Sequence, residues 1–154
     1  MASSMTATPA ADPARPARNQ GLGRILVMVY AVFALSAVAR SLFQILSQFD
    51  VAPVAYLLSA FAAVVYVVAT LSLARSGPRA WRVALAAVLV ELAGVVGVGL
   101  WTVLDPGLFA DETVWSRFGA GYGYVPLVLP VVGLAWLLAH RPERSDAAAS
   151  REER

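Results

Sequence analysis

Residues 81–104 read WRVALAAVLVELAGVVGVGLWTVL, an apolar run whose interior holds a single charged side chain, Glu91. A helix needs about 20 mostly apolar residues to cross the roughly 30 Å of hydrocarbon in a bilayer. This run is long enough to do so. It therefore predicts a transmembrane helix, with a carboxyl group inside the membrane.

Three more runs meet the same length requirement. They occupy residues 24–46, 53–74 and 122–139. The last is the shortest and contains Pro126 and Pro130, so we expect it to kink or loosen in its outer half. The four runs together predict an all-α membrane domain over residues 22–140. In this domain, four transmembrane helices form an up-down bundle.

The composition of the chain agrees with a membrane protein. Of its 154 residues, 59% are hydrophobic and 14% are charged, whereas a soluble domain is typically about 45–50% apolar and about 25% charged. The formal net charge is only +2, so we expect no nucleic-acid partner, because such a partner needs concentrated basic surface. The absence of cysteine and the single histidine exclude disulfides and Cys- or His-rich metal sites.

The arginines predict the orientation. Ten of the 12 basic residues lie on one side of the predicted spans: Arg15, Arg18, Arg24, Arg75, Arg79, Arg82, Arg141, Arg144, Arg151 and Arg154. The other side has Arg40 and Arg117, with the acids Asp50, Asp105, Asp111 and Glu112. Short loops rich in Lys or Arg stay in the cytoplasm. We therefore expect a bacterial inner-membrane protein with both termini cytoplasmic.

The two ends of the chain lack apolar periodicity. Residues 1–21 are rich in Ala, Ser, Thr and Pro, and residues 141–154 are polar and charged, so both are expected to be disordered cytoplasmic tails. An alternative for the start is a signal peptide, with residues 1–39 removed after the small residues 37–39. The apolar run continues to Leu46, which favours an uncleaved first span.

Two ionisable residues fall within the spans, and such residues normally face protein or water rather than lipid. At 1.5 Å per residue, Glu91 lies roughly 13 Å from the cytoplasmic edge and Arg40 roughly 24 Å from it. Polar and small residues recur at helical spacing on three spans, which predicts faces turned toward a common axis. These faces are Phe33, Ser36, Arg40, Gln44 and Ser47; Tyr56, Ser59, Ala63, Tyr66 and Thr70; and Ala84, Ala87, Glu91 and Gly94. The predicted intramembrane polar cluster is Glu91, Arg40, Tyr66, Ser36, Gln44 and Ser59.

Three hypotheses remain for Glu91. In the first, it is protonated or hydrogen-bonded to Tyr66 or Ser36, because a carboxyl group in a low-dielectric environment tends to take up a proton. In the second, it pairs with Arg40, since side chains lean toward the helix N-terminus and leave a vertical gap of roughly 5 Å. In the third, it carries a proton or cation along a transport path.

Arg40 and Gln44 have simpler alternatives. Arg40 lies near the outer surface, where its long side chain can extend to water or meet Asp50, Asp105 or Glu112. Gln44, one turn further on, is expected to satisfy a backbone or loop group. The sequence does not decide between these contacts and a pair with Glu91.

The stretch DPGLFADETVWSRFGAGYGY, residues 105–124, predicts a short amphipathic helix on the outer interface, capped by Asp111 or Thr113. Glycines then give flexible backbone positions. One hypothesis is a lid over an outward-facing cavity; the other, which we favour, is a re-entry that shields the tops of the helices. The residues of the predicted lid are Asp111, Glu112, Trp115, Arg117, Gly119, Gly121 and Gly123.

Enzymatic chemistry finds little support. Asp111 and Glu112 are adjacent, so they do not form an acid–base pair on one face of a helix. No serine has a His or Lys at a spacing that suggests a nucleophile, and His140 lies at the inner end of the last span. The glycines of residues 94–99 lie inside an apolar span without a following lysine, which predicts close helix packing rather than a phosphate loop. We expect no catalytic residues, cofactor or metal.

Two stretches carry a resemblance: TVWSRFGAGYGYVPLVLP at 113–130 and APVAYLLSAFAAVVYVVAT at 52–70. They resemble small, uncharacterised four-helix integral membrane proteins of actinobacteria. The resemblance covers residues 24–139 and implies a four-helix fold, but no activity, cofactor or site residue.

The leading functional hypothesis is therefore a non-enzymatic structural or accessory membrane component. Its partners are the lipid bilayer and either a second copy or another membrane protein. The alternative is a small proton-linked transporter or channel subunit, in which Glu91 titrates and Arg40 attends a polar or anionic solute. A membrane-embedded lipid enzyme is the weakest of the three.

Overall fold

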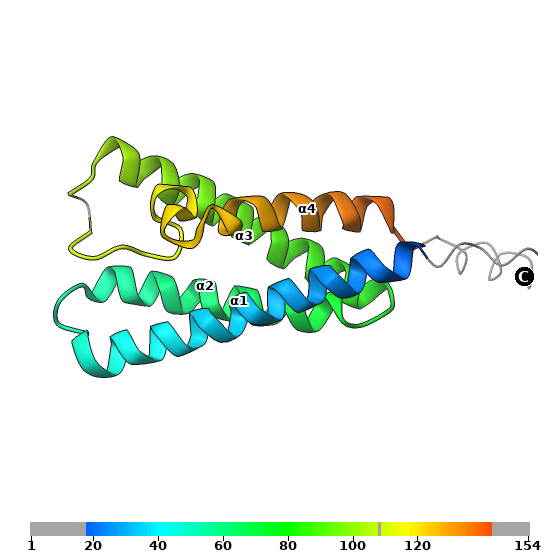
Figure 1. Ribbon diagram of the computed structural model, residues 1–154, viewed down its shortest axis with the longest axis horizontal. Helices are drawn as coiled ribbons and strands as arrows, with labels where there is room; N and C mark the ends of the chain where they lie inside the picture. Colours follow the sequence, from blue (N-terminus) through cyan, green and yellow to red (C-terminus); the bar gives the residue numbers. More distant parts are fainter. Residues whose placement is uncertain (1–17, 108, 143–154) are drawn as a thin grey trace, which may run out of the picture.

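The computed structural model describes residues 18–107 and 109–142, which contain helices and no strand (Figure 1). The helices are α1 (Arg18–Gln48), α2 (Pro53–Leu73), α3 (Pro78–Leu104), the 3₁₀ helix η1 (Ser116–Tyr122) and α4 (Val125–Ala139). The all-α prediction is confirmed. The predicted tails lie mostly outside the described residues, except that α1 already includes residues 18–21.

Proline marks three of the helix starts. Pro53, Pro78 and Pro126 lie in the first turns of α2, α3 and α4, where the missing N–H would have no partner within the helix anyway. Pro130 lies inside α4, and the helix continues across it. The chain bends by 101° between η1 and α4, in the outer part of the predicted span and before Pro126.

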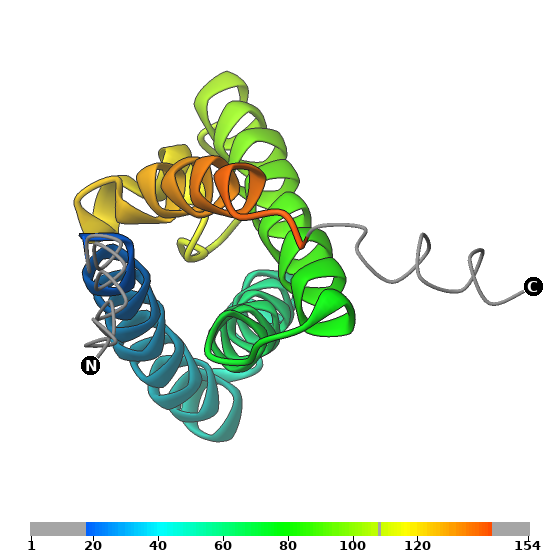
Figure 2. The same cartoon turned by 90° about the vertical axis from the view of Figure 1, so that its right-hand side faces the viewer.

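Consecutive helices pack side by side, α1 on α2, α2 on α3 and α3 on α4, and α4 returns to touch α1 (Figure 2). The turn at 49–52 and the long loop at 105–115 lie at one end of the molecule, which we call the loop end (Figure 1). The turn at 74–77, the start of α1 and the end of α4 lie at the other, which we call the tail end. α1 and α3 therefore face each other diagonally, without close backbone contact.

Three helices are long and apolar enough to cross a membrane: Gly21–Gln48, Pro53–Leu73 and Pro78–Leu104. α4 has 15 residues and so extends over only about 22 Å, less than the roughly 30 Å of hydrocarbon. It qualifies as a fourth candidate only together with η1, as a broken span or a re-entrant loop. The structure thus supports three spans directly, against the four predicted.

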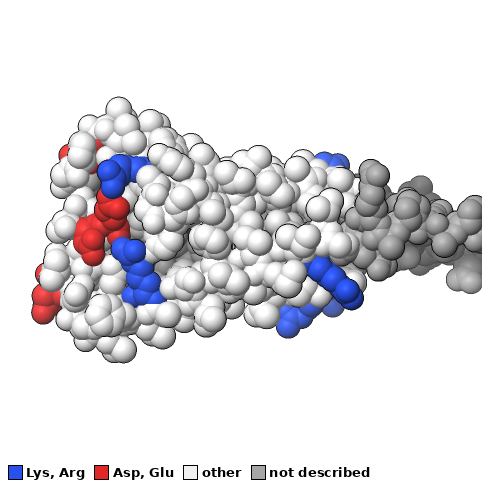
Figure 3. Space-filling view, in the orientation of Figure 1, with Lys and Arg blue, Asp and Glu red and all other residues white. Residues whose placement is uncertain are grey.

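The surface has the character of a membrane protein. Acidic and basic groups gather at the loop end, only basic groups show at the tail end, and the middle of this face is uncharged (Figure 3). Large apolar side chains project from every long helix, such as Leu35, which is 73% exposed. An apolar exposed surface of this extent belongs against lipid or protein rather than water.

The buried face of α1 differs from the predicted one. It consists of Leu26, Tyr30, Ala34, Ala37, Ser41 and Gln44. Ser36 and Ser47, predicted to face inward, are exposed. A serine hydroxyl can bond to a carbonyl of its own helix, as Ser47 does with Phe43 at 2.6 Å, so serine does not determine which face turns inward.

The inward faces of the next two helices match the prediction. On α2, Tyr56, Ser59, Ala63 and Tyr66 are all buried. On α3, Ala84, Ala87 and Glu91 are buried, and Gly94 is half-buried. These faces combine one or two large polar side chains with small residues, which let neighbouring helices approach closely in an apolar medium.

Candidate functional site

Glu91 lies at the centre of the helices and is fully buried (0% exposed). The hydroxyl of Tyr30 on α1 donates a hydrogen bond to its Oε2 at 2.9 Å. Tyr30 thus connects α1 to α3, the two helices that face each other diagonally. The sequence prediction missed it, although Tyr30 is six residues past Arg24, roughly 9 Å deep and near the level of Glu91.

Tyr66 and Trp115 complete the surroundings of Glu91. The Tyr66 hydroxyl lies beside both the Glu91 carboxyl and the Trp115 indole. Its ring centroid is 6.3 Å from that of Tyr30 and 6.4 Å from that of Phe33. We call Glu91, Tyr30, Tyr66 and Trp115 the Glu91 centre. It joins α1, α2, α3 and the loop.

Several polar atoms of the Glu91 centre are not paired. The Tyr66 hydroxyl, Glu91 Oε1 and Trp115 Nε1 are buried without a hydrogen-bond partner among the described residues. A phenol can accept from an indole N–H and donate to a carboxylate at the same time. The three groups are therefore chemically complementary, with Tyr66 between the other two.

Trp115 reaches this position because the loop turns inward. Its side chain is only 2% exposed, and its ring makes an edge contact with Phe61 at a centroid distance of 6.2 Å. The indole lies on Gly94 of α3, where a Cβ atom would come within 2.5 Å of the ring. Gly99 likewise admits Phe118, to which a Cβ would come within 2.6 Å. These glycines accommodate loop side chains, rather than the neighbouring helix that the sequence suggested.

Backbone hydrogen bonds to buried hydroxyls hold the re-entering loop. The N–H of Val114 donates to Ser59 Oγ at 3.4 Å, and that of Arg117 donates to Thr102 Oγ1 at 2.8 Å. The N–H of Thr113 donates to Ser116 Oγ at 2.9 Å. Ser59, predicted as part of the polar cluster, therefore anchors the loop.

The predicted interfacial helix is displaced along the chain. The structure has a 3₁₀ helix over Ser116–Tyr122, whereas the apolar residues Val114 and Trp115 are buried before it begins. Arg117, Phe118 and Gly119 have positive φ angles of 49°, 60° and 78°. A left-handed conformation costs a non-glycine residue roughly 1–2 kcal/mol. This loop is held in place by tertiary contacts rather than by its own backbone preference.

Arg40 contacts the loop. Its Nη1 donates to the Tyr122 hydroxyl at 2.6 Å, its Nη2 donates to the Glu112 carbonyl at 3.4 Å, and the guanidinium carbon lies 5.4 Å from the centre of the Tyr122 ring. No salt bridge joins Arg40 to Glu91 among the described residues. Of the three hypotheses for Glu91, the pair with Arg40 is therefore not supported: Tyr30 bonds to the carboxyl group, and Arg40 extends to the loop.

Gln44 and the acidic residues of the loop lie nearby. Gln44 Nε2 donates to Asp111 Oδ2 at 3.3 Å, which confirms the expectation that Gln44 satisfies a loop group. Glu112 forms an exposed ion pair with Arg117. We call Arg40, Gln44 and their partners Asp111, Glu112 and Tyr122 the loop clasp. The loop clasp connects α1 to the loop near the surface of the protein and is separate from the Glu91 centre.

The glycines of the predicted lid have distinct environments. Gly119 is buried, with a φ of 78°, and a Cβ there would come within 2.7 Å of Pro126. Gly123 has a φ of 62° and open surroundings, and Gly121 is exposed near Glu112. Gly119 is required by a close approach and Gly123 by its backbone conformation, so neither needs a hinge role to explain it.

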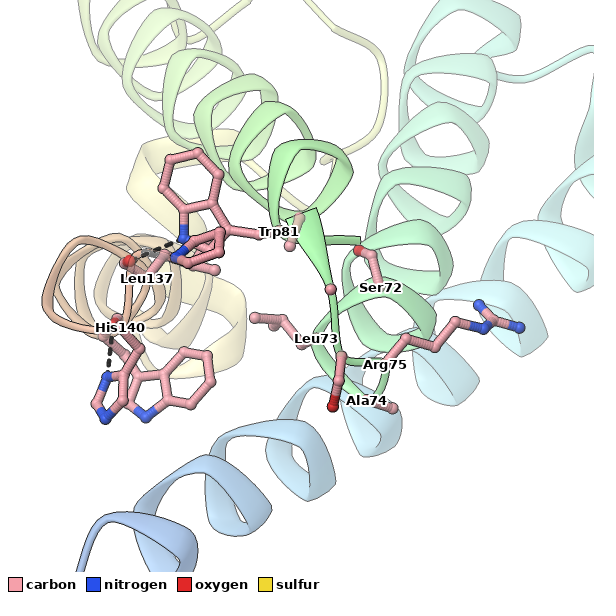
Figure 4. A pocket seen from close by; sticks show the side chains of 12 residues that line it. Ser72, Leu73, Ala74, Arg75, Trp81, Leu137 and His140 are labelled. Carbon is pink, nitrogen blue, oxygen red and sulfur yellow. Dashed lines mark hydrogen bonds between the residues drawn. The ribbon is translucent and has the colours of Figure 1, made fainter. Parts of the chain in front are cut away.

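The tail end has an open cavity of about 310 Å³ between the turn at 74–77 and the end of α4 (Figure 4). Trp81 Nε1 donates to the Leu137 carbonyl at 2.9 Å, which ties α3 to α4. His140 stacks on Trp136 with centroids 4.6 Å apart, and its Nδ1 is 2.9 Å from the Trp136 carbonyl. His140 has the helix-terminal position expected from the sequence.

No protein-family model, curated protein or solved structure matches this chain. A functional interpretation therefore depends on the geometry of the Glu91 centre, the loop and the two ends of the molecule.

Proposed function

We propose that the chain is a non-enzymatic structural or accessory protein of a bacterial inner membrane, with four spans in an up-down bundle. η1 and α4 together form the fourth span, and the re-entrant loop shields the outer ends of the helices. The arginine-rich tail end lies in the cytoplasm with both termini. The three long apolar helices and the uncharged middle surface support this arrangement.

The observation that carries the proposal is the hydrogen bond from Tyr30 to Glu91. It connects two helices that face each other diagonally and have no close backbone contact. Between apolar helices in an apolar solvent there is no hydrophobic driving force, so packing and interhelical hydrogen bonds hold the helices together. A buried carboxyl group with a tyrosine donor is suited to this structural role.

Two substitutions at Glu91 test the structural role. Glu91→Gln retains the shape and an oxygen acceptor, whereas Glu91→Leu leaves the Tyr30 hydroxyl buried without its partner. We expect Glu91→Leu to lower the free energy of unfolding in mixed micelles by about 1–3 kcal/mol and Glu91→Gln to lower it much less. Glu112→Gln, at the exposed ion pair, is the matched control. Equal stability of the wild-type and Leu variants would contradict the structural role.

A second candidate function is proton-linked transport, and a separate observation favours it. The unpaired Glu91 Oε1, Tyr66 hydroxyl and Trp115 Nε1 form a buried polar patch next to the loop. A titrating Glu91 in that patch is the kind of group that proton carriers use inside membranes. If Glu91→Gln folds normally but abolishes a proton flux that the wild-type protein supports in proteoliposomes, transport replaces the accessory role.

Labelling of introduced cysteines tests the topology, because the native chain has no thiol. A cysteine at Ser76, in the turn between α2 and α3, is expected to be inaccessible to a membrane-impermeant reagent added to intact cells. A cysteine at Ala110, an exposed residue of the loop, is expected to react. Labelling of Ser76→Cys from outside would overturn the orientation. Crosslinking in native membranes then measures whether a second copy or another membrane protein is the partner.

A further inference from the structure

An apolar groove of about 440 Å³ lies between α1 and α4. Of the neighbouring helices, this pair has the least contact. Leu22 and Val29 mark its extent on α1, a distance of about 10 Å along the helix. Ala135 lies on its α4 side and Ala139 near the tail end. The groove therefore runs from the tail end into the part of the molecule that faces hydrocarbon.

The groove adjoins the more polar cavity at the tail end. Trp136 and His140 line both spaces. Figure 4 shows Trp81 and His140 on one side of the cavity and Ser72, Leu73 and Arg75 on the other. The indole Nε1 of Trp136 is buried without a hydrogen-bond partner among the described residues. The apolar groove and the more polar cavity thus meet at these two side chains.

The charge at this end has one sign. Among the described residues, the charged side chains of the tail end are all basic: Arg24, Arg75, Arg79, Arg82 and Arg141. Arg24 is next in the sequence to two residues at the groove. Ile25 lines the groove, and a Cβ at Gly23 would come within 3.0 Å of the Trp136 ring. An arginine near a membrane surface attracts anionic lipid headgroups.

We propose that the groove and cavity together bind one anionic phospholipid of the cytoplasmic leaflet. An acyl chain occupies the groove between α1 and α4, and the phosphate group lies at the mouth of the cavity, beside the exposed Arg75. The inference rests on the proposed orientation, which places the tail end at the cytoplasmic surface.

The test measures which lipid the intact protein retains. The full chain is purified in detergent and incubated with micelles containing equal parts phosphatidylglycerol and phosphatidylcholine, and the bound lipids are counted by native mass spectrometry. We expect phosphatidylglycerol to be retained preferentially. Arg75→Gln is expected to reduce this preference about fivefold, the typical contribution of one arginine to binding an anionic membrane.

Arg82→Gln is the matched control. Arg75 and Arg82 are both exposed, and each donates to the carbonyl four residues earlier in the chain, that of Leu71 and Pro78 respectively. Only Arg75 lines the cavity. An equal loss of preference in the two variants would show general surface attraction and would overturn the site.

Ala135→Trp fills the groove and is expected to abolish retention of phosphatidylglycerol while leaving Arg75 in place. Equal retention of both lipids by the wild-type protein would overturn the inference. So would a dimer that Ala135→Trp dissociates, because a second copy would then occupy the groove. Equal retention of the two lipids, or such a dimer, leaves the proposed function standing if the cysteine at Ser76 still shows the expected topology. Labelling of that cysteine from outside the cell would overturn both the lipid site and the proposed orientation.

Discussion

The polar groups at the loop end of the molecule have different surroundings from those at the tail end. At the loop end, chain residues 113–122 fold inward, and Ser59, Thr102 and Arg40 contact them from three different helices. At the tail end, a short turn leaves an open cavity and exposed arginines. One end is closed by its own chain, whereas the other stays open.

The difference indicates that the loop end contributes more to the stability of the fold than the tail end does. The loop end combines buried aromatic side chains with strained backbone at Arg117 and Phe118, and strain persists only where the surroundings determine the conformation. The tail end has no comparable contacts to lose at its arginines. Substitutions at the loop end should therefore change folding, and those at the tail end should change binding. The following predictions test this contrast, from the largest expected effect to the smallest.

Trp115→Ala is expected to have the largest effect. It removes a buried indole from between α2 and α3, and such a loss typically costs about 3–5 kcal/mol. The measurement is the free energy of unfolding in mixed micelles. Trp101→Ala is the control, because Trp101 is also near the loop end but is 59% exposed. Similar losses for the two tryptophans would mean that the loop does not stabilise the helices.

Gly94→Ala is expected to cost about 1–3 kcal/mol, the usual effect of overpacking a filled site. The added Cβ would come within 2.5 Å of the Trp115 ring, and neither the indole nor the helix backbone has space to move far. Gly97→Ala, three residues further on, meets no atom within 4 Å and should be neutral or stabilising by up to about 1 kcal/mol. Thermal unfolding of the two variants in the same detergent compares them directly. Equal melting temperatures would argue against a tight contact at Gly94.

Tyr124→Gly tests the backbone strain. Tyr124 is exposed and has a φ of 61° just before α4, a conformation that glycine adopts without the steric cost paid by other residues. We expect Tyr124→Gly to be more stable than Tyr124→Ala by about 1 kcal/mol, since both lose the phenol but only glycine relieves the strain. A chemical denaturation series measures this difference. Alanine equal to or better than glycine would indicate a relaxed backbone.

Arg79→Gln is expected to have the smallest effect, within about 0.5 kcal/mol of the wild-type stability, as is usual for surface substitutions. Arg79 is exposed in the first turn of α3 at the tail end. Arg40→Gln at the loop clasp, by comparison, loses hydrogen bonds to Tyr122 and Glu112 and should cost about 0.5–1.5 kcal/mol. If the tail-end substitution cost more in the same unfolding assay, the contrast between the two ends would fail.

The long helices were accessible from the sequence, but their predicted starts at residues 24, 53 and 81 agree with the structure only at Pro53, the first residue of α2. Apolar length predicts α1, α2 and α3, and prolines mark the starts of α2 and α3. The inward position of Glu91 and Tyr66 also followed from helical spacing and the cost of burying polar groups in lipid. The sequence predicted a fourth span over residues 122–139. The 15 residues of α4 are too few to cross the membrane without η1.

The partner of Glu91 depended on the rotation of α1, which the sequence did not reveal. Ser36 and Tyr30 lie on different faces of that helix, and only Tyr30 is buried. In water, the face with more apolar residues turns inward. In lipid, the surroundings of the helix are as apolar as its interior, so this contrast is lost and side-chain shape decides the rotation.

What the sequence determined by itself is local in origin: the lengths of the apolar runs, the prolines in the first turns of α2, α3 and α4, and the gathering of arginine at one end of the predicted spans. Each depends on residues close together along the chain. Tertiary structure alone decided that Trp115 enters the helices at Gly94, that Arg40 bonds to Tyr122, and that Tyr30 bonds to Glu91. These contacts join residues far apart in the sequence, and each needs the shape and rotation of two packed elements at once.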